Sequence, residues 1–266
     1  MSTLFLVHAH PDDESISTGG VMMRAKEAGH RVVLVTCTRG EEGEIHNLDP
    51  DLVRPRLGQV RTQELEAAGR ILGVDRLEFL GYRDSGMAGT PPNQDPRSFH
   101  QAPPAEAAER LARLLREERP AVVITENADG TYGHPDHVQA HRTTLAALDL
   151  LAKEGWSPPK LYFTAVRREL LEEFRKQMPE DAARFPIAGT PEREITAFVD
   201  VRPYLERKRR AFAAHLTQND PNSPLTTMAA QIYELAFGTE CFVLGRGQAA
   251  GHPESDLFAG VDSAQA

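Results

Sequence analysis

The first 165 residues alternate short apolar runs with longer amphipathic segments. The runs are rich in β-branched residues and are not interrupted by polar ones, as in Val32–Thr36 and Ala121–Thr125. Runs of this kind form strands that are buried on both faces, so helices must cover both sides of the sheet. The alternation therefore predicts an α/β protein with a Rossmann-like, mostly parallel sheet flanked by helices.

The pattern places each element along the chain. The predicted strands are 4–8, 32–36, 76–80, 121–125, 161–166 and 238–244, with an extended segment at 194–200. The predicted helices are 17–28, 55–72, 105–118, 135–153, 167–177 and 202–216. A chain of 266 residues with 40% hydrophobic content can bury one substantial core. We expect a catalytic core at 1–165 and a smaller C-terminal α+β extension at 166–266, packed on the same domain and completing the pocket. The tail from Gly245 is expected to be a loose cover or partly disordered.

Histidines and carboxylates cluster just after two of the predicted strands, and loops 39–55 and 83–104 leave the same edge. Open α/β sheets bind ligands at this edge. A catalytic metal ion takes three His or carboxylate ligands and keeps a further position open. We predict His10, Asp13 and His137 as the ligands. Asp12 would then stay free to accept a proton from the attacking water.

Other residues of the two clusters allow more than one interpretation. The acidic residues after Pro11 also suit the start of a helix. His134 lies near the substrate rather than the metal, as an acid or an oxyanion donor. Asp136 either orients the imidazole of His10 or His134, or is an acidic first-turn residue. His141 is expected to be a packed or outer-layer histidine.

The two clusters, Ala9–Glu14 and His134–His137, resemble the PIG-L or LmbE-like family of zinc-dependent N-acetylglucosamine deacetylases. Four further segments are similar to the branch that contains the mycothiol-pathway deacetylase and the mycothiol S-conjugate amidase: Thr36–Glu44, Arg83–Thr90, Tyr132–Gly133 and His215–Gln218. The resemblance covers most of the chain and is strong over residues 3–150.

The resemblance implies a role for each matching residue. It makes His10, Asp13 and His137 zinc ligands, with Fe²⁺ as an alternative metal, and Asp12 the general base. It makes His134 the electrostatic catalyst or general acid, and Tyr132 a residue that polarises the amide carbonyl.

For three residues, the resemblance and the sequence pattern give different interpretations. The resemblance has Arg61 and Asp84 hold the sugar and gives His215 a place at the pocket. On pattern alone Arg61 fits a solvated helix face, Asp84 begins a turn, and His215 caps or packs a helix.

The implied reaction removes the acetyl group of an N-acetylglucosaminyl conjugate, including a low-molecular-weight thiol precursor, to give an amino sugar and acetate. Two alternatives stay open: a thiol S-conjugate amidase of detoxification, and a metal-stabilised sugar-binding protein without turnover. The chain departs from its relatives at 126–131 and in the short segment 183–200, which both border the expected pocket.

Composition narrows the partners and the compartment. A net charge of −9 disfavours binding to nucleic acid and to anionic membranes. The expected partner, a small-molecule sugar conjugate, is what the resemblance implies. Cys37 and Cys241 are expected to be buried in strands, which suits a reducing cytoplasm. Neither a signal peptide nor an apolar run of about 20 residues is evident. A homo-oligomer is compatible with the sequence.

A glycine pair at Thr18-Gly19-Gly20 invites comparison with a phosphate-binding turn. It lacks the spacing of the dinucleotide-binding fingerprint, and acidic residues precede it. We predict instead that these glycines allow a helix to pack closely against the sheet.

Overall fold

The structure is a computed structural model that describes residues 1–177 and 187–261. Its strands are β1 (Thr3–His8), β2 (Arg31–Thr36), β3 (Arg76–Phe79), β4 (Val122–Thr125), β5 (Lys160–Ala165), β6 (Ala197–Asp200) and β7 (Thr239–Arg246). Among the described residues they form one sheet in the order β3-β2-β1-β4-β5-β7-β6. Strands β1 to β5 run parallel, whereas β7 is antiparallel to both β5 and β6. The predicted mostly parallel α/β architecture is confirmed.

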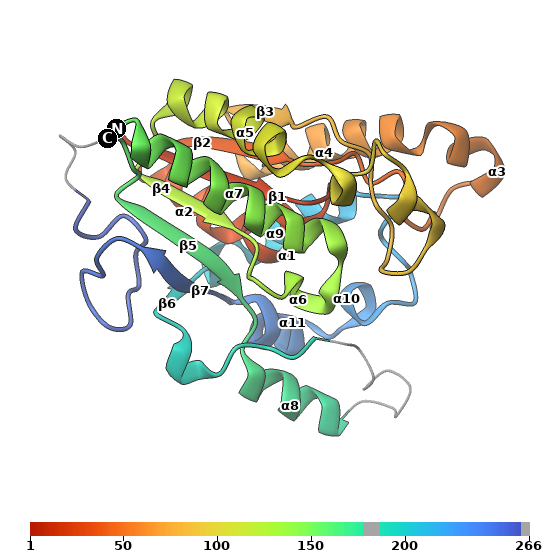
Figure 1. The fold of residues 1–266 in the computed structure, drawn as a ribbon. Helices are drawn as coiled ribbons and strands as arrows, with labels where there is room; N and C mark the ends of the chain where they lie inside the picture. Colours follow the sequence, from red (N-terminus) through yellow and green to blue (C-terminus); the bar gives the residue numbers. More distant parts are fainter. Residues whose placement is uncertain (178–186, 262–266) are drawn as a thin grey trace.

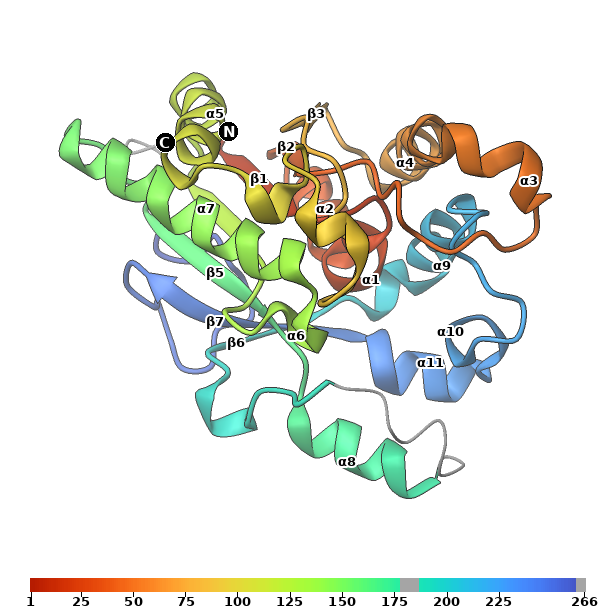
Figure 2. The same ribbon diagram turned by 45° about the vertical axis from the view of Figure 1, so that its right-hand side comes forward.

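Helices cover both faces of this sheet (Figures 1 and 2). They are α1 (Asp13–Ser17), α2 (Gly19–Glu27), α3 (Pro50–Val53), α4 (Leu57–Leu72), α5 (Pro104–Glu118), α6 (Gly130–Gly133), α7 (Pro135–Lys153), α8 (Arg168–Gln177), α9 (Leu205–Ala214), α10 (Pro224–Thr227) and α11 (Ala230–Phe237). Alternate residues of β1 face opposite layers, as a strand requires. Phe5 and Val7 pack toward α5 and α7, whereas Leu4 and Leu6 pack toward α2, α4 and α9.

The strand order reverses beside β1, which places β2 on one side and β4 on the other. Val7 pairs with Thr125 in parallel register, so β1 and β4 end at the same edge of the sheet. A reversal of this kind opens a crevice at the carboxyl ends of the strands. The loops that follow β1 and β4 carry the two His/Asp clusters, and they therefore meet.

The predicted helix at 17–28 is interrupted near its start. Thr18 has a non-helical φ of −139° and separates α1 from α2. Its Oγ1 lies 2.8 Å from His8 Nε2, so the break serves a buried contact. No element was predicted at 217–237, where the structure has α10 and α11.

The last strand and the tail differ from a simple parallel continuation. The strand predicted at 238–244 exists as β7, which lies between β5 and β6 in the sheet. The tail is anchored, because the buried Glu254 accepts hydrogen bonds from Lys160 and Tyr162. Residues 262–266 of the tail and 183–186 of the segment 183–200 lie outside the described residues.

Gly20 packs against Val201, the residue directly after β6. The close contact predicted for the glycine pair therefore exists, but it lies just past the end of a strand rather than within the sheet. A Cβ on Gly20 would lie 2.3 Å from Val201 Cβ, which no side chain tolerates. The carboxylate of Glu240 accepts the N–H groups of Gly20 and Val21, each at 2.8 Å, and pairs with the buried Lys208. An internal carboxylate thus satisfies the N-terminus of α2.

Two further expectations concern the whole chain. Cys37 and Cys241 are buried free thiols, as predicted, but only Cys241 lies in a strand, because Cys37 directly follows β2. Within the described residues, the helices are all too short or too polar to cross a bilayer.

Candidate active site

Three side chains from two distant segments of the chain converge at the carboxyl edge of the sheet. Donor atoms of His10, Asp13 and His137 all lie within 4.8 Å of one another. His10 follows β1, Asp13 begins α1, and His137 lies in the first turn of α7. The His10 N–H donates to Asp13 Oδ2 at 2.8 Å, and His137 Nε2 lies 3.5 Å from Asp13 Oδ1. Two imidazoles and one carboxylate at these distances fit a divalent metal ion.

The imidazole of His10 is oriented from behind by Asp136. Its Nδ1 lies 3.9 Å from Asp13 Oδ2, whereas its Nε2 lies 3.2 Å from Asp136 Oδ2. Asp136 in turn accepts hydrogen bonds from the backbone N–H and the hydroxyl of Ser85. A carboxylate behind a ligating histidine fixes its tautomer and its orientation. Both alternatives for Asp136 hold in the structure, because it contacts His10 and is also an acidic residue in the first turn of α7.

Asp12 lies beside the three donors in an unusual backbone conformation. Its φ is 116°, which a non-glycine residue seldom adopts. The Asp12 N–H donates to Glu14 Oε2 at 2.9 Å, and Arg61 Nη2 lies 3.3 Å from Asp12 Oδ2. Burial raises the pKa of Asp12 to about 6, although Arg61 opposes that rise.

Arg61 is buried rather than solvated, so the interpretation as an exposed helix face is wrong. Its side chain is 3% exposed. The guanidinium donates to the carbonyls of Gly40 and Pro11. A Cβ on Gly40 would lie 2.0 Å from Arg61 Nη1, and Gly40 has a φ of +66°, so this position requires glycine. Loop 39–55 is thereby fixed against the site.

His134 caps α7 through its ring. Its Nδ1 accepts the N–H of Asp136 at 3.1 Å, so the proton of the neutral ring is on Nε2. That nitrogen lies 4.0 Å from Asp84 Oδ1. Burial, together with His10 and His137, lowers the pKa of His134 to about 2.

Asp84 combines its predicted turn with a place in the site. Its Oδ1 accepts the N–H of Gly86 at 2.8 Å and lies 3.6 Å from His10 Nε2. Burial alone would raise the pKa of Asp84, but the neighbouring His10 outweighs it and holds the pKa below its usual range. Loop 83–104 therefore contributes a negative charge to the cluster.

Tyr132 reaches the cluster from α6, the short helix before α7. Its Oη lies 3.3 Å from His137 Nε2. The preceding Thr131 has a φ of 65°, a strained value for a β-branched residue. Burial and the nearby Asp13 raise the pKa of Tyr132, so the phenol keeps its proton and can donate it in a hydrogen bond.

Sequence reasoning missed two buried pairs behind the cluster. Glu126 Oε1 lies 2.7 Å from His8 Nδ1, and His215 Nε2 lies 2.7 Å from Glu14 Oε1. His215 also caps α9, so it is a packed residue that supports the site through Glu14. Burial raises the pKa of Glu14, but His215 outweighs it and the pKa falls to about 2. The available signal was a charged residue at the end of an apolar strand, as at His8 and Glu126.

His141 is packed, as expected. Its Nδ1 lies 2.9 Å from the carbonyl oxygen of Glu126, and its ring packs against Phe163. It therefore supports the loop after β4 and lies outside the cluster of donor atoms.

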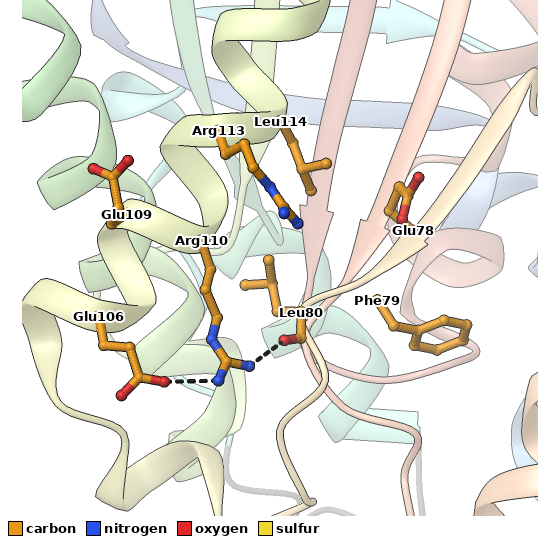
Figure 3. A pocket seen from close by; sticks show the side chains of 8 residues that line it. All are labelled: Glu78, Phe79, Leu80, Glu106, Glu109, Arg110, Arg113 and Leu114. Atoms are coloured by element: carbon orange, nitrogen blue, oxygen red, sulfur yellow. Dashed lines mark hydrogen bonds and ion pairs between the residues drawn. The ribbon is translucent and has the colours of Figure 1, made fainter.

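The site reaches solvent at Asp12 and Asp13, whose side chains are 19% and 13% exposed. A separate cavity of about 550 Å³ lies between β3 and α5 (Figure 3). Its lining is mostly charged, and Arg110 there contacts Glu106 and the carbonyl of Leu80. The residues around this cavity include none of the predicted site residues.

The fold and the site together define a class. The chain belongs to the PIG-L family, whose sequence model, described as GlcNAc-PI de-N-acetylase, matches residues 5–148. Over 287 aligned residues the chain is 45% identical to a 1D-myo-inositol 2-acetamido-2-deoxy-alpha-D-glucopyranoside deacetylase of Acidothermus cellulolyticus, covering 99% of this chain and 97% of the relative.

Solved structures share the fold. An N,N'-diacetylchitobiose deacetylase of Pyrococcus horikoshii matches with a TM-score of 0.64 at 20% identity, over 91% of this chain and 83% of that chain. GalB, a 4-carboxy-2-hydroxymuconate hydratase of Pseudomonas putida, matches with a TM-score of 0.63 at 20% identity, over 94% and 98%. Because a hydratase and a deacetylase share this architecture, the reaction must be argued from the site.

Proposed function

We propose that this protein is a metal-dependent deacetylase that hydrolyses the acetamide of an N-acetylglucosaminyl conjugate. The observation that carries the proposal is the convergence of His10, Asp13 and His137, while the carboxylate of Asp12, the residue before Asp13, contacts Arg61. The name of the Acidothermus cellulolyticus relative supports an inositol glycoside of N-acetylglucosamine as the substrate. A low-molecular-weight thiol precursor is the corresponding biological class.

His10, Asp13 and His137 would hold the metal, which we propose to be Zn²⁺, with Fe²⁺ as the alternative. When bound, such an ion polarises the amide carbonyl and lowers the pKa of water. The N–H of His10 on Asp13 and the carboxylate of Asp136 on His10 keep these donors in place before the ion arrives.

Asp12 is the proposed general base. It accepts a proton from the water that attacks the acetyl carbon, and it gives that proton to the nitrogen when the C–N bond breaks. Glu14 holds the Asp12 backbone and Arg61 holds its carboxylate, so the proposed base is kept in one orientation. The products are acetate and a free amine.

His134 and Tyr132 are the proposed oxyanion donors. Protonation of His134 Nδ1 would break its cap on Asp136, so the ring is better suited to donate a hydrogen bond from Nε2 than to act as an acid. Tyr132 offers its hydroxyl from α6, the short helix that directly precedes His134. Arg61 and Asp84 are proposed to contact the sugar in addition to holding Asp12 and His10.

An assay of both products tests the proposal. Protein stripped of metal and then restored with Zn²⁺ or Fe²⁺ is incubated with N-acetylglucosaminyl-inositol and with simpler N-acetylglucosamine conjugates. We expect acetate and free amine in equal amounts, and only in the metal-restored samples.

The alternatives give different products. An S-conjugate amidase would release a larger acyl-bearing thiol conjugate instead of acetate. A sugar-binding protein would bind the conjugates without forming a free amine, and that result with metal-loaded protein would overturn the proposed function.

A further inference from the structure

Glu126 is a buried acid for which the proposed reaction has no use. It directly follows β4, and its side chain is 3% exposed. Burying a carboxylate costs free energy unless the group is paired or serves the site. Its position at the reversal of strand order, among the donor residues, favours a role in the site.

The two imidazole nitrogens of His137 face different surroundings. Its Nε2 faces the cluster, 3.5 Å from Asp13 Oδ1 and 3.3 Å from Tyr132 Oη. Its Nδ1 is buried and makes no hydrogen bond with the described residues. Glu126 Oε2 lies 3.4 Å from this nitrogen. When Nε2 binds a cation, the ring proton must be on Nδ1, which then needs an acceptor.

Glu126 is itself fixed by the ends of two strands. Its Oε1 lies 2.7 Å from His8 Nδ1, and its Oε2 lies 3.5 Å from Thr164 Oγ1. His8 is held in turn by Thr18, 2.8 Å from its Nε2. The carboxylate is therefore positioned without help from His137, so it can impose an orientation on that ring.

The other histidine of the cluster has the same arrangement. His10 faces Asp13 with Nδ1, and its Nε2 lies 3.2 Å from the buried Asp136. Each of the two imidazoles thus has a separate buried carboxylate behind it. This parallel indicates that Glu126 orients His137 in the same way as Asp136 orients His10.

We propose that Glu126 is a positioning residue of the metal site. Its carboxylate accepts a hydrogen bond from the Nδ1–H of His137, and this orients Nε2 toward the cation. The inference rests on the proposed function, because it takes His137 as a metal ligand. It adds a residue that the paired His/Asp motifs do not contain. It also gives His8 a role, as the side chain that holds Glu126.

The test measures metal affinity rather than turnover. Zinc dissociation constants of the wild type and of Glu126→Gln are determined by competition with a chromophoric chelator, and the visible spectra of the cobalt-loaded proteins are compared. We expect Glu126→Gln to bind zinc about 10- to 100-fold more weakly, as is typical when a carboxylate behind a ligand is lost. The cobalt spectrum should shift, because His137 is no longer oriented.

The matched control is Glu254→Gln. This variant also removes a buried carboxylate, but Glu254 contacts Lys160 at the start of β5, at the opposite end of the sheet. It should lose stability and keep wild-type zinc affinity. Equal zinc affinities for wild type and Glu126→Gln would overturn the inference, as would an equal loss in Glu254→Gln.

A measurement on the wild type covers the case in which Glu126→Gln does not fold. Nitrogen NMR of the zinc-loaded protein should show His137 bound through Nε2 with a proton on Nδ1. Coordination through Nδ1 would overturn the role of Glu126 and leave the metal site standing. A wild-type protein that binds no zinc would instead overturn the proposed function, and this inference with it.

Discussion

At the scale of single residues, the backbone of Asp12 determines where the proposed base lies. A φ of 116° costs about 1–3 kcal/mol in a non-glycine residue. The hydrogen bond from the Asp12 N–H to Glu14 and the contact with Arg61 offset that cost. Strain of this size is typical of positions where geometry serves a reaction, because an unstrained loop would point the carboxylate elsewhere.

Substitutions of Asp12 and of His10 should therefore have different effects on metal content and turnover. Asp12→Ala is expected to keep the metal and to lose about 100- to 10,000-fold in kcat, since it removes a proton acceptor and leaves the donors intact. His10→Ala is expected to lose the metal. Metal content by atomic absorption and turnover by acetate release check both variants. Unchanged zinc in His10→Ala would contradict its assignment as a ligand.

At the scale of elements, α2 packs closely against the residue that follows β6. Gly20→Ala would place a methyl group 2.3 Å from Val201 Cβ, so we expect it to destabilise the protein by about 1–3 kcal/mol. Gly69→Ala in α4 is the control, because its added methyl would meet Val74 at 3.6 Å, an ordinary contact. That variant should gain about 0.5–1 kcal/mol. Urea unfolding measures both, and equal effects would contradict the packing argument.

The elements also show what a sequence can predict. Strands β1 and β4 and the helix α7 follow directly from apolar runs and periodicity, and the two motifs follow from their positions after β1 and β4. The split at Thr18 and the antiparallel insertion of β7 could not be predicted, because both depend on tertiary partners. Short helices such as α10 lack a distinct apolar pattern.

The candidate site divides in the same way. His10, Asp13 and His137 carry ligand chemistry in their own motifs, so the sequence indicated them. The roles of Glu126 and His215 depend on which strands and helices become neighbours. A single sequence records a buried charge of this kind only as an interruption in an apolar pattern.

At the scale of the whole molecule, one buried pair joins the tail to the start of β5. Burial raises the pKa of Glu254, but hydrogen bonds from Lys160 and Tyr162 outweigh it, and the net pKa lies below its usual range. A carboxyl group with a lowered pKa contributes stability above its unfolded pKa of about 4.3. That contribution is lost as the pH falls through the folded pKa.

The free energy of unfolding should therefore depend on Glu254 in a pH-dependent way. At pH 7, Glu254→Gln should cost about 3–5 kcal/mol, because it leaves the buried Lys160 without its counter-charge. The difference from the wild type should narrow as the pH is lowered from 5 toward 3. Denaturant unfolding across this range measures it, and a constant difference would contradict the assignment.

The two parts of the chain should also unfold together. We propose that residues 166–266 pack on the core as one unit, since β7 pairs with β5 and Glu240 binds the N-terminus of α2. A chain ending at residue 165 should then show no cooperative thermal transition by circular dichroism. A sharp transition in that fragment would indicate two independent folding units.

The carboxylate of Glu240 also determines which anions can bind at the N-terminus of α2. Proteins of this topology that use dinucleotides seat a pyrophosphate at the helix that follows the first strand. In this chain, the carboxylate of Glu240 in β7 already accepts the N–H groups of Gly20 and Val21 at the N-terminus of α2. We therefore expect that neither ATP nor inorganic phosphate binds at the N-terminus of α2.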